Sequence, residues 1–207
     1  MSSTALKPQG EPLEPTWDMA KLYPNQGTWT EEEYLSLDAN RLIEFSDGNV
    51  EVLDMPTTGH QLIVAFLYSA LLGFCSPLRL GLPLFAPLRV KLRSGKYREP
   101  DVVFMLKANA HHVHNDFWEG ADLVMEVVSD DRRRDLEIKR VEYAHSNIPE
   151  YWIVDPQNQR ITVLVLQEGA YQVHGHYSRG ERASSVLLSG FAIDVTATLN
   201  AAASHSD

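Results

Sequence analysis

The sequence predicts a mixed α/β (α+β) fold with a central mixed β-sheet flanked by helices, and three observations predict it. Apolar residues recur at helical spacing from about 60 to 74. Residues 88–93 alternate between apolar and basic side chains, as in a half-buried strand. Two apolar runs rich in β-branched residues, 101–105 and 122–128, have the pattern of buried strands. The order helix, strand, strand, strand, helix, strand is typical of this class.

Each element in the first half has a local reason. Thr30 and Glu33 are spaced as in a capping box, which predicts a short helix over 29–40. Asp47-Gly48 is a tight-turn dipeptide, so residues 41–54 are expected to form a hairpin that carries Glu44 on its first strand. Ser94-Gly95 is a second turn signal, and we expect 88–93 and 97–106 to pair as an antiparallel hairpin.

The second half reads as a strand, a helix and three further strands. A strand over 122–129 is followed by a helix to about 146, where Asn147 fits a left-handed cap and Pro149 prevents continuation. One helix face, expected to look inward, carries Leu136, Lys139, Arg140 and Tyr143. The later strands are predicted at 151–155, 160–166 and 171–177.

Length and composition fit one domain with frayed ends. The chain has 207 residues, of which 44% are hydrophobic and 22% charged. We expect disordered tails at 1–16 and 198–207 and a single domain over 17–197. The single cysteine, Cys75, and the lack of a visible secretory signal favour a cytoplasmic protein. The apolar segment 62–75 is shorter than the roughly 20 residues that span a bilayer, so no membrane is expected.

Charge narrows the functional classes. The net charge of −10 argues against a protein that coats nucleic acid non-specifically. A basic stripe nevertheless lies just before Asp101, and its members are candidate nucleic-acid contacts: Arg89, Lys91, Arg93, Lys96 and Arg98. A solvated strand face is an equally good interpretation of this stripe. The window 130–142 holds five basic and five acidic residues, which favours mutually paired side chains over phosphate contacts.

Asp101 and Glu126 are the candidates for chemistry. Both lie in apolar strand-like runs, where an unpaired charge costs several kcal/mol, so they must be neutralised, paired or bound to a cation. Paired strands lie about 4.8 Å apart, and two such carboxylates can share one hard ion such as Mg²⁺. Lys139 would then orient water or offset charge during phosphodiester hydrolysis. A structural ion pair with a nearby arginine is the alternative for either acid.

These motifs resemble a known group of nucleases. Pro100-Asp101 followed by Glu126 is similar to the PD-(D/E)XK restriction-endonuclease-like superfamily, although Val128 stands where a lysine is usual. A closer resemblance, over about 28–195, is to the Uma-type “putative restriction endonuclease” family. It rests on Arg-Glu-Pro-Asp-Val-Val (98–103), Glu-Val-Val-Ser (126–129), the run 133–144, Pro-Glu-Tyr-Trp-Ile-Val-Asp-Pro (149–156) and Ser-Gly-Phe-Ala-Ile-Asp-Val (189–195).

The resemblance implies a restriction-endonuclease-like αβββαβ core with an N-terminal helix and hairpin and C-terminal strands. It also implies a Mg²⁺- or Mn²⁺-dependent endonuclease acting on DNA, with the lysine moved from the strand to the helix at Lys139. Glu44 enters as an additional acid, and Val127 joins Asp101 and Glu126 in the expected metal site. Tyr143 could donate to a substrate oxygen, although a core role is commoner. A homodimer is expected, because cutting both strands of a duplex calls for two sites.

Other interpretations stay open or are set aside. Val128 and the acidic balance also fit a catalytically degenerate module that keeps the fold and binds nucleic acid or a protein partner. A structural zinc is not expected from three histidines in a polar loop without a further ligand at a recognisable spacing (His111, His112 and His114). Ser129 lacks the Gly-x-Ser-x-Gly elbow of serine hydrolases.

Overall fold

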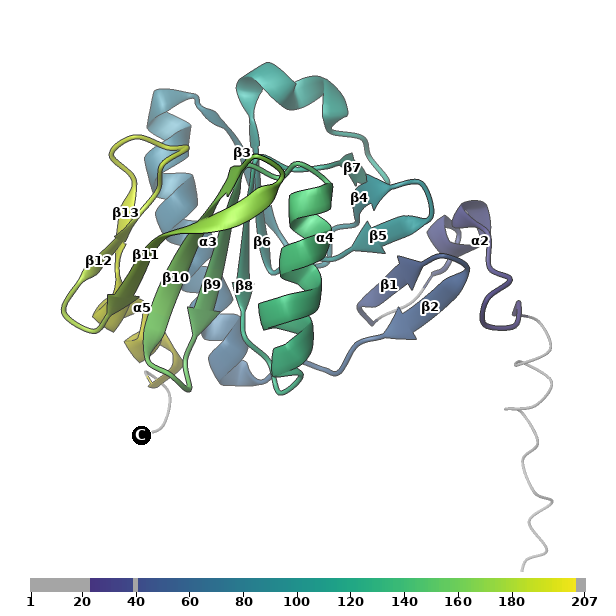
Figure 1. The fold of residues 1–207 in the computed structure, drawn as a ribbon, viewed down its shortest axis with the longest axis horizontal. Coiled ribbons are helices and arrows are strands. Elements are labelled where there is room, and N and C mark those ends of the chain that lie inside the picture. Colours follow the sequence, from purple (N-terminus) through teal and green to yellow (C-terminus); the bar gives the residue numbers. More distant parts are fainter. Residues whose placement is uncertain (1–22, 39–40, 204–207) are drawn as a thin grey trace, which may run out of the picture.

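A six-stranded sheet forms the centre of the molecule (Figure 1). The computed structural model describes residues 23–38 and 41–203. In spatial order the strands are β11 (Ala170–Ser178), β10 (Arg160–Gln167), β9 (Glu150–Asp155), β8 (Leu123–Val127), β6 (Val102–Leu106) and β3 (Gly81–Phe85). β8 and β9 are parallel, and the other neighbours are antiparallel. The sheet is therefore mixed, as the sequence predicted.

Helices cover both faces of this sheet. Successive side chains of each strand point to opposite faces, and apolar side chains on both faces are buried under a helix. On one face, α3 (Thr58–Leu78) packs against Phe104 and Met125. On the other, α4 (Lys139–His145) packs against Val103 and Val124. Strands buried on both faces read as continuous apolar runs, which explains the pattern seen in the sequence.

The helix α3 is longer than its predicted range. Thr57 caps its first turn, accepting a hydrogen bond from the backbone N–H of His60, and Arg79 ends it in the left-handed conformation. The helix has 21 residues and contains an 18-residue window with a mean hydropathy of 1.7, which is long and apolar enough to cross a membrane, so the argument from length given above is wrong. Its buried residues pack on the six-stranded sheet. A helix that packs in a protein core can have the same length and apolar composition as a membrane-spanning helix.

A second, smaller sheet has the order β2 (Asn49–Val52), β1 (Ile43–Ser46), β5 (Lys96–Arg98), β4 (Val90–Arg93) and β7 (Trp118–Glu119). The helix α2 (Glu31–Leu35) begins at the predicted capping box of Thr30 and Glu33. Both predicted hairpins form, but the expected single strand over 97–106 is wrong. The chain leaves the small sheet after Arg98 and enters the six-stranded sheet at Val102, because Pro100 lacks an N–H and restricts the residue before it.

Three further elements differ from the predictions. The strand β3 was not predicted; it contains Pro83, which an edge strand tolerates. The helix after β8 contains a π-helical turn, η2 (Arg134–Ile138), before α4 begins. The 3₁₀ helix η1 (Lys107–His112) occupies the first part of the segment that reads as a polar loop.

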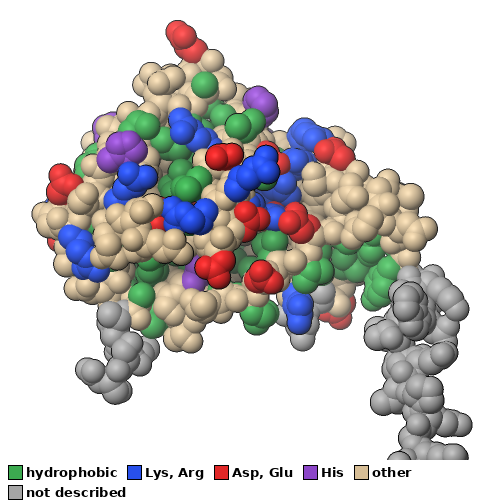
Figure 2. Space-filling view, turned by 60° about the horizontal axis from the view of Figure 1, so that its bottom comes forward, with side chains coloured by type: hydrophobic (Ala, Val, Ile, Leu, Met, Phe, Trp, Pro, Cys, Tyr) green, Lys and Arg blue, Asp and Glu red, His purple; other side chains and the backbone are tan. Residues whose placement is uncertain are grey.

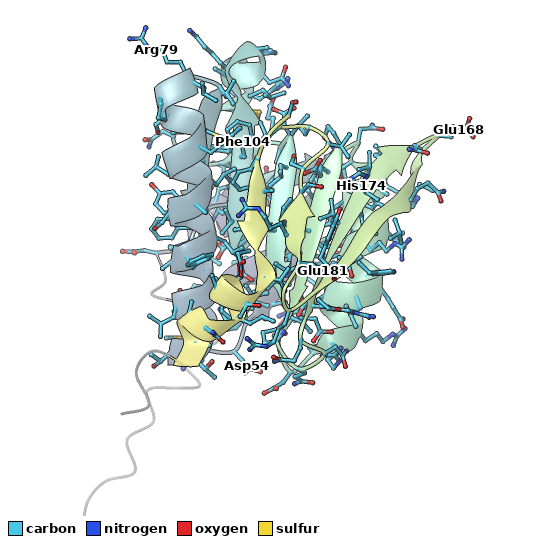
Figure 3. All side chains as sticks on the ribbon, turned by 90° about the vertical axis from the view of Figure 1, so that its left-hand side faces the viewer. Asp54, Arg79, Phe104, Glu168, His174 and Glu181 are labelled. Carbon is cyan, nitrogen blue, oxygen red and sulfur yellow. The ribbon has the colours of Figure 1, made fainter. Side chains whose placement is uncertain are left out.

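The C-terminal end is folded where a tail was expected. The strands β12 (Arg182–Ser184) and β13 (Ala192–Asp194) pair, and α5 (Val195–Asn200) and the 3₁₀ helix η3 (Ala201–Ala203) follow. Thr198 and Leu199 are buried, and Figure 3 shows α5 beside the N-terminal end of α3. The predicted tail from 198 is therefore wrong up to 203. The predicted tail at 1–16 lies outside the described residues.

Candidate active site

Two adjoining strands bring Asp101 and Glu126 to one place. Val102 pairs with Met125 in the antiparallel β6–β8 ladder, so continuing the register sets Asp101 opposite Glu126. The backbone N–H of Val127 donates to Oδ2 of Asp101 at 2.8 Å. Glu126 is only 1% exposed. The two carboxylates thus occupy the arrangement expected from the sequence.

Lys139 approaches the acids from the helix. Its Nζ lies 3.0 Å from Oε2 of Glu126 and 3.2 Å from Oδ1 of Asp135. The backbone N–H of Lys139 donates to the carbonyl of Arg134, five residues back, which is the π-helical spacing. Tyr143, one turn further on, donates its hydroxyl to Oε1 of Glu126 at 2.5 Å. The inward face predicted for this helix therefore holds Lys139 and Tyr143, and Tyr143 contacts an acid of the site.

The electrostatics of this cluster keep the amine charged. Burial opposes a charged Lys139, but the negative charges of Glu126, Glu44 and Asp135 outweigh it and raise the lysine's pKa. Burial also raises the pKa of Glu126 to about 8; Lys139 opposes this shift, and the negative charge of Asp101 adds to it. A second cation beside the two acids would favour the ionised form of Glu126.

Two groups that sequence reasoning did not place in the site contact it. His60, in the first turn of α3, has its Nε2 3.2 Å from Oδ2 of Asp101. Burial lowers the pKa of His60, but the hydrogen bond and charge of Asp101 raise it above the ordinary value. Asp135 accepts hydrogen bonds from the backbone N–H and hydroxyl of Ser129 at 2.9 and 2.8 Å. Asp135 lies four residues before Lys139, and this helical spacing could have predicted the contact between them from the sequence.

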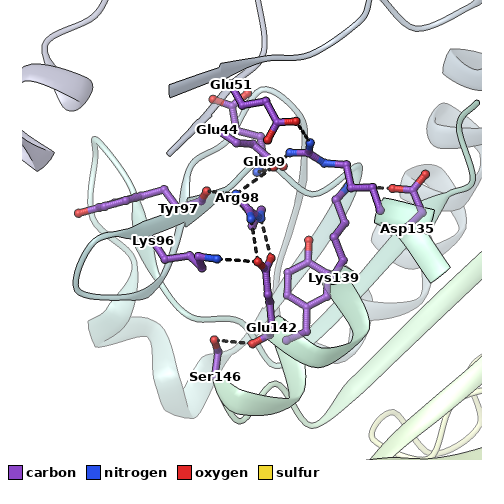
Figure 4. Close-up of polar contacts among 12 residues, drawn as sticks. Glu44, Glu51, Lys96, Tyr97, Arg98, Glu99, Asp135, Lys139, Glu142 and Ser146 are labelled. Carbon is purple, nitrogen blue, oxygen red and sulfur yellow. Dashed lines mark hydrogen bonds and ion pairs between the residues drawn. The ribbon is translucent and has the colours of Figure 1, made fainter. Parts of the chain in front are cut away.

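Glu44 lies behind the site. It is fully buried on β1, where it contacts Arg134 and lies 3.2 Å from Arg98 (Figure 4). It also accepts the backbone N–H of Glu99 at 3.2 Å. Among the described residues, Glu44 is not one of those that line the cavity beside Asp101 and Glu126, which is described below. The structure therefore places this acid in an ion-pair network.

The basic stripe is engaged within the protein. Arg98 donates to both carboxylate oxygens of Glu142 at 2.7 and 2.8 Å, and Lys96 bonds the same group at 2.6 Å (Figure 4). The other three contacts are Lys91 with Glu31, Arg93 with Asp47, and Arg89 with the carbonyls of Leu35 and Leu37. The predicted free cationic face is therefore not what the structure shows, because Arg89, Lys91, Lys96 and Arg98 contact α2, the residues that follow it, or α4, and Arg93 pairs with Asp47 in the β1–β2 turn.

The three arginines at 132–134 form ion pairs with acids of the protein. Arg132 contacts Asp155, Arg133 contacts Glu137, and Arg134 contacts Glu44 and Glu51. Figure 2 shows acidic and basic side chains interspersed on the face that it brings forward. The three arginines are paired as expected, but only Arg133 has its partner inside the window 130–142; Arg132 and Arg134 pair with acids from other parts of the chain.

A cavity of about 450 Å³ opens beside the acids. It is lined by Asp101, Glu126, Val127 and Lys139 together with the β2–α3 connection and the loop after β8. Within the described part of the chain, three buried side-chain nitrogen or oxygen atoms lack a hydrogen-bond partner, and all belong to residues lining this cavity: His60 Nδ1, Glu99 Oε2 and Arg134 Nε. Such atoms are expected where a ligand or ordered water completes the site.

The donor set fits a hard divalent cation. In the residues described, Asp101 uses one oxygen for its protein contacts, which leaves the other for a ligand. No cluster of three or more potential metal-ligating side chains occurs among those residues. Asp101 and Glu126 would be the two protein carboxylates of a site completed by water and substrate, which is how Mg²⁺ is usually bound. Because Tyr143 and Lys139 contact both oxygens of Glu126, the cation would take the place of one of these contacts.

A mixed sheet covered by helices, with two acids on adjoining strands and a lysine beside them, is the arrangement of the restriction-endonuclease-like fold. A solved structure from Anabaena variabilis ATCC 29413, described as a putative nuclease belonging to DUF820, is similar, with a TM-score of 0.69 and 16% identity over 84% of this chain and 99% of that one. The chain belongs to the Uma2 family, described as “Putative restriction endonuclease”, whose model matches residues 31–196. Among curated proteins there is no match.

Proposed function

We propose that this chain is a Mg²⁺- or Mn²⁺-dependent nuclease that hydrolyses phosphodiester bonds in DNA. The observation that carries the proposal is the convergence of Asp101, Glu126 and Lys139 at one cavity. The family and the fold support a nuclease, and the donor set supports a metal that prefers oxygen ligands.

The residues divide the work of hydrolysis. Asp101 and Glu126 would hold the cation beside Val127. A bound divalent cation supplies charge neutralisation at the phosphate and a more acidic water. Lys139 presents a charged amine that can donate hydrogen bonds to phosphoryl oxygens as negative charge grows on them. In the net reaction the water oxygen bonds to phosphorus, the bond to the leaving sugar oxygen breaks, and that oxygen gains a proton.

Other side chains position these groups. His60 contacts Oδ2 of Asp101, and Tyr143 donates to Oε1 of Glu126, so each acid is held by a neighbour. Asp135 holds Lys139 from the preceding turn. Fixing the acids and the amine before substrate arrives lowers the cost of organising them during the reaction.

The proposal is tested by Mn²⁺ calorimetry together with cleavage of single-stranded and duplex oligonucleotide DNA. Asp101→Asn should lower Mn²⁺ affinity and cleavage together, and Lys139→Gln should lower cleavage by at least about a hundredfold. Asp116→Asn and Lys107→Gln alter exposed residues outside the cavity and serve as matched controls. Metal-dependent cleavage that survives both site variants would reject the assignment.

A second candidate is a catalytically degenerate module that keeps the fold and binds nucleic acid or a protein. It is favoured by Glu126, both of whose oxygens already have protein partners, and by Val128, whose side chain is packed in the core where a strand lysine would stand. Absence of Mn²⁺ binding at millimolar concentration, with oligonucleotide binding retained, would favour this module. The homodimer stays a prediction that light scattering can test.

A further inference from the structure

We infer that the substrate enters this site as an unpaired strand or strand end, with one nucleotide seated in the cavity, and not as an intact duplex. The inference rests on the proposed nuclease function and narrows its substrate class. Three features of the cavity carry it: the depth of the reactive groups, the charge of the lining and an apolar lip.

The reactive groups lie deep in a small cavity. The side chains of Glu126 and Lys139 are 2% and 6% exposed, and that of Asp101 is 13% exposed. The cavity volume of about 450 Å³ is near the lower end of the roughly 300–1,000 Å³ that small-molecule sites occupy. A site of this size accepts a unit such as a nucleotide, whereas a duplex would have to remain at its mouth.

The lining disfavours a dense array of phosphates. Besides Asp101, Glu126 and Asp135, the cavity wall carries the acidic residues Glu51, Asp54, Glu99, Asp130 and Asp131. Among the described residues, this wall contains one arginine, Arg134, and one lysine, Lys139, and both are paired with acids. A duplex brings about one negative charge per 1.7 Å of its axis, while the end of a single strand brings few. The basic stripe cannot offset the difference, because its cations are paired within the protein.

An apolar lip borders the cavity where the chain passes from β2 to α3. Met55 is 68% exposed and Val52 is 52% exposed, and both line the cavity with Leu53 and Pro56 beside them. An unstacked base has free apolar faces that bury well against such side chains. Bases inside a duplex are stacked on one another and present no face to this lip, so the lip matches an unpaired nucleotide.

The experiment compares binding and cleavage of matched DNA forms. Fluorescence anisotropy with Ca²⁺ would measure binding of a single strand, a blunt duplex of the same sequence and a duplex with a single-stranded overhang, and Mn²⁺ would then start cleavage. We expect the single strand and the overhang to be bound and cut at least tenfold better than the blunt duplex. Met55→Gln and Val52→Asn should each weaken single-strand binding about five- to tenfold, from the apolar contact removed.

Val173→Asn is the matched control for the lip. Val173 is a 46% exposed valine on the edge strand β11, outside the cavity lining, and its substitution should leave binding unchanged. Equal binding and cleavage of the blunt duplex, or lip variants that bind like the wild type, would overturn the inference while leaving the nuclease proposal intact. If no form is cut but single-strand binding still depends on the lip, the ligand class holds and the catalytic proposal fails.

Discussion

Replacing Glu44 by glutamine distinguishes an ion-pair role from a metal-binding role for this acid. The buried carboxylate contacts the guanidinium groups of Arg98 and Arg134 and accepts the backbone N–H of Glu99. Glutamine keeps the size and one acceptor oxygen but removes the charge. Two buried cations would then lose a shared anionic partner.

The loss of stability can be worked out from these contacts. Removing one partner of a buried ion pair costs about 3–5 kcal/mol. Arg98 would keep Glu142 and Arg134 would keep Glu51, so we expect the lower end, about 3 kcal/mol. In a domain of this size 1 kcal/mol corresponds to about 2–4 °C, which predicts a fall in Tm of roughly 6–12 °C.

Urea and thermal unfolding without metal, followed by circular dichroism, would measure this loss. Glu51→Gln is a matched control, because Glu51 lies opposite Glu44 in the β1–β2 ladder and contacts the same Arg134 but is 57% exposed. Its substitution should cost less than about 1 kcal/mol. A loss below 1 kcal/mol for Glu44→Gln, with Mn²⁺ affinity reduced tenfold, would refute the ion-pair reasoning and make Glu44 a metal ligand.

Three further predictions concern other parts of the molecule. Gly81→Ala should destabilise the chain by about 1–3 kcal/mol in urea unfolding, because the added methyl group would overlap the carbonyl oxygen of Met105 in the neighbouring strand; wild-type stability would contradict this packing. Burial opposes ionisation of Glu31, but hydrogen bonds from Lys91, Gly95 and Tyr97 lower its pKa to about 2. Its carboxylate therefore contributes stability above the ordinary pKa of 4.5, by at most about 3 kcal/mol, and this is lost as the pH falls toward 2. Urea midpoints of Glu31→Gln should consequently change less over this range than those of the wild type, and parallel curves would disprove the assignment. Deleting Glu137 from the π-helical turn should restore α-helical spacing and displace Lys139 from Glu126, lowering cleavage at least about tenfold with an unchanged far-UV spectrum. Unaltered cleavage would show that the turn does not position the lysine.

Local patterns predicted the elements that local physics determines. The capping box at Thr30 and the turn at Asp47-Gly48 lie where the structure has a helix start and a hairpin. The placement of Asp101 and Glu126 followed from a similar argument, because charged residues inside apolar strands need a partner or an ion. The helix face that carries Lys139 was also evident from its spacing.

Features that depend on distant partners were beyond such patterns. Lys96 and Arg98 meet Glu142 across separations of 46 and 44 residues, and Arg134 meets Glu44 across 90. Charge along the sequence shows that these side chains exist but not which of them are neutralised. The small sheet was likewise hidden, because the strand β5 looks continuous with β6 until the partners of each are known.

The lysine on the helix has a consequence for finding other chains of this kind. A motif scan that demands a basic residue two positions after the second acid rejects this chain, since Val128 stands there. A more suitable template pairs a strand acid with an inward lysine on the next helix and a tyrosine four residues later, as at Lys139 and Tyr143. Chains set aside as inactive for want of the strand lysine merit rescreening with that spacing.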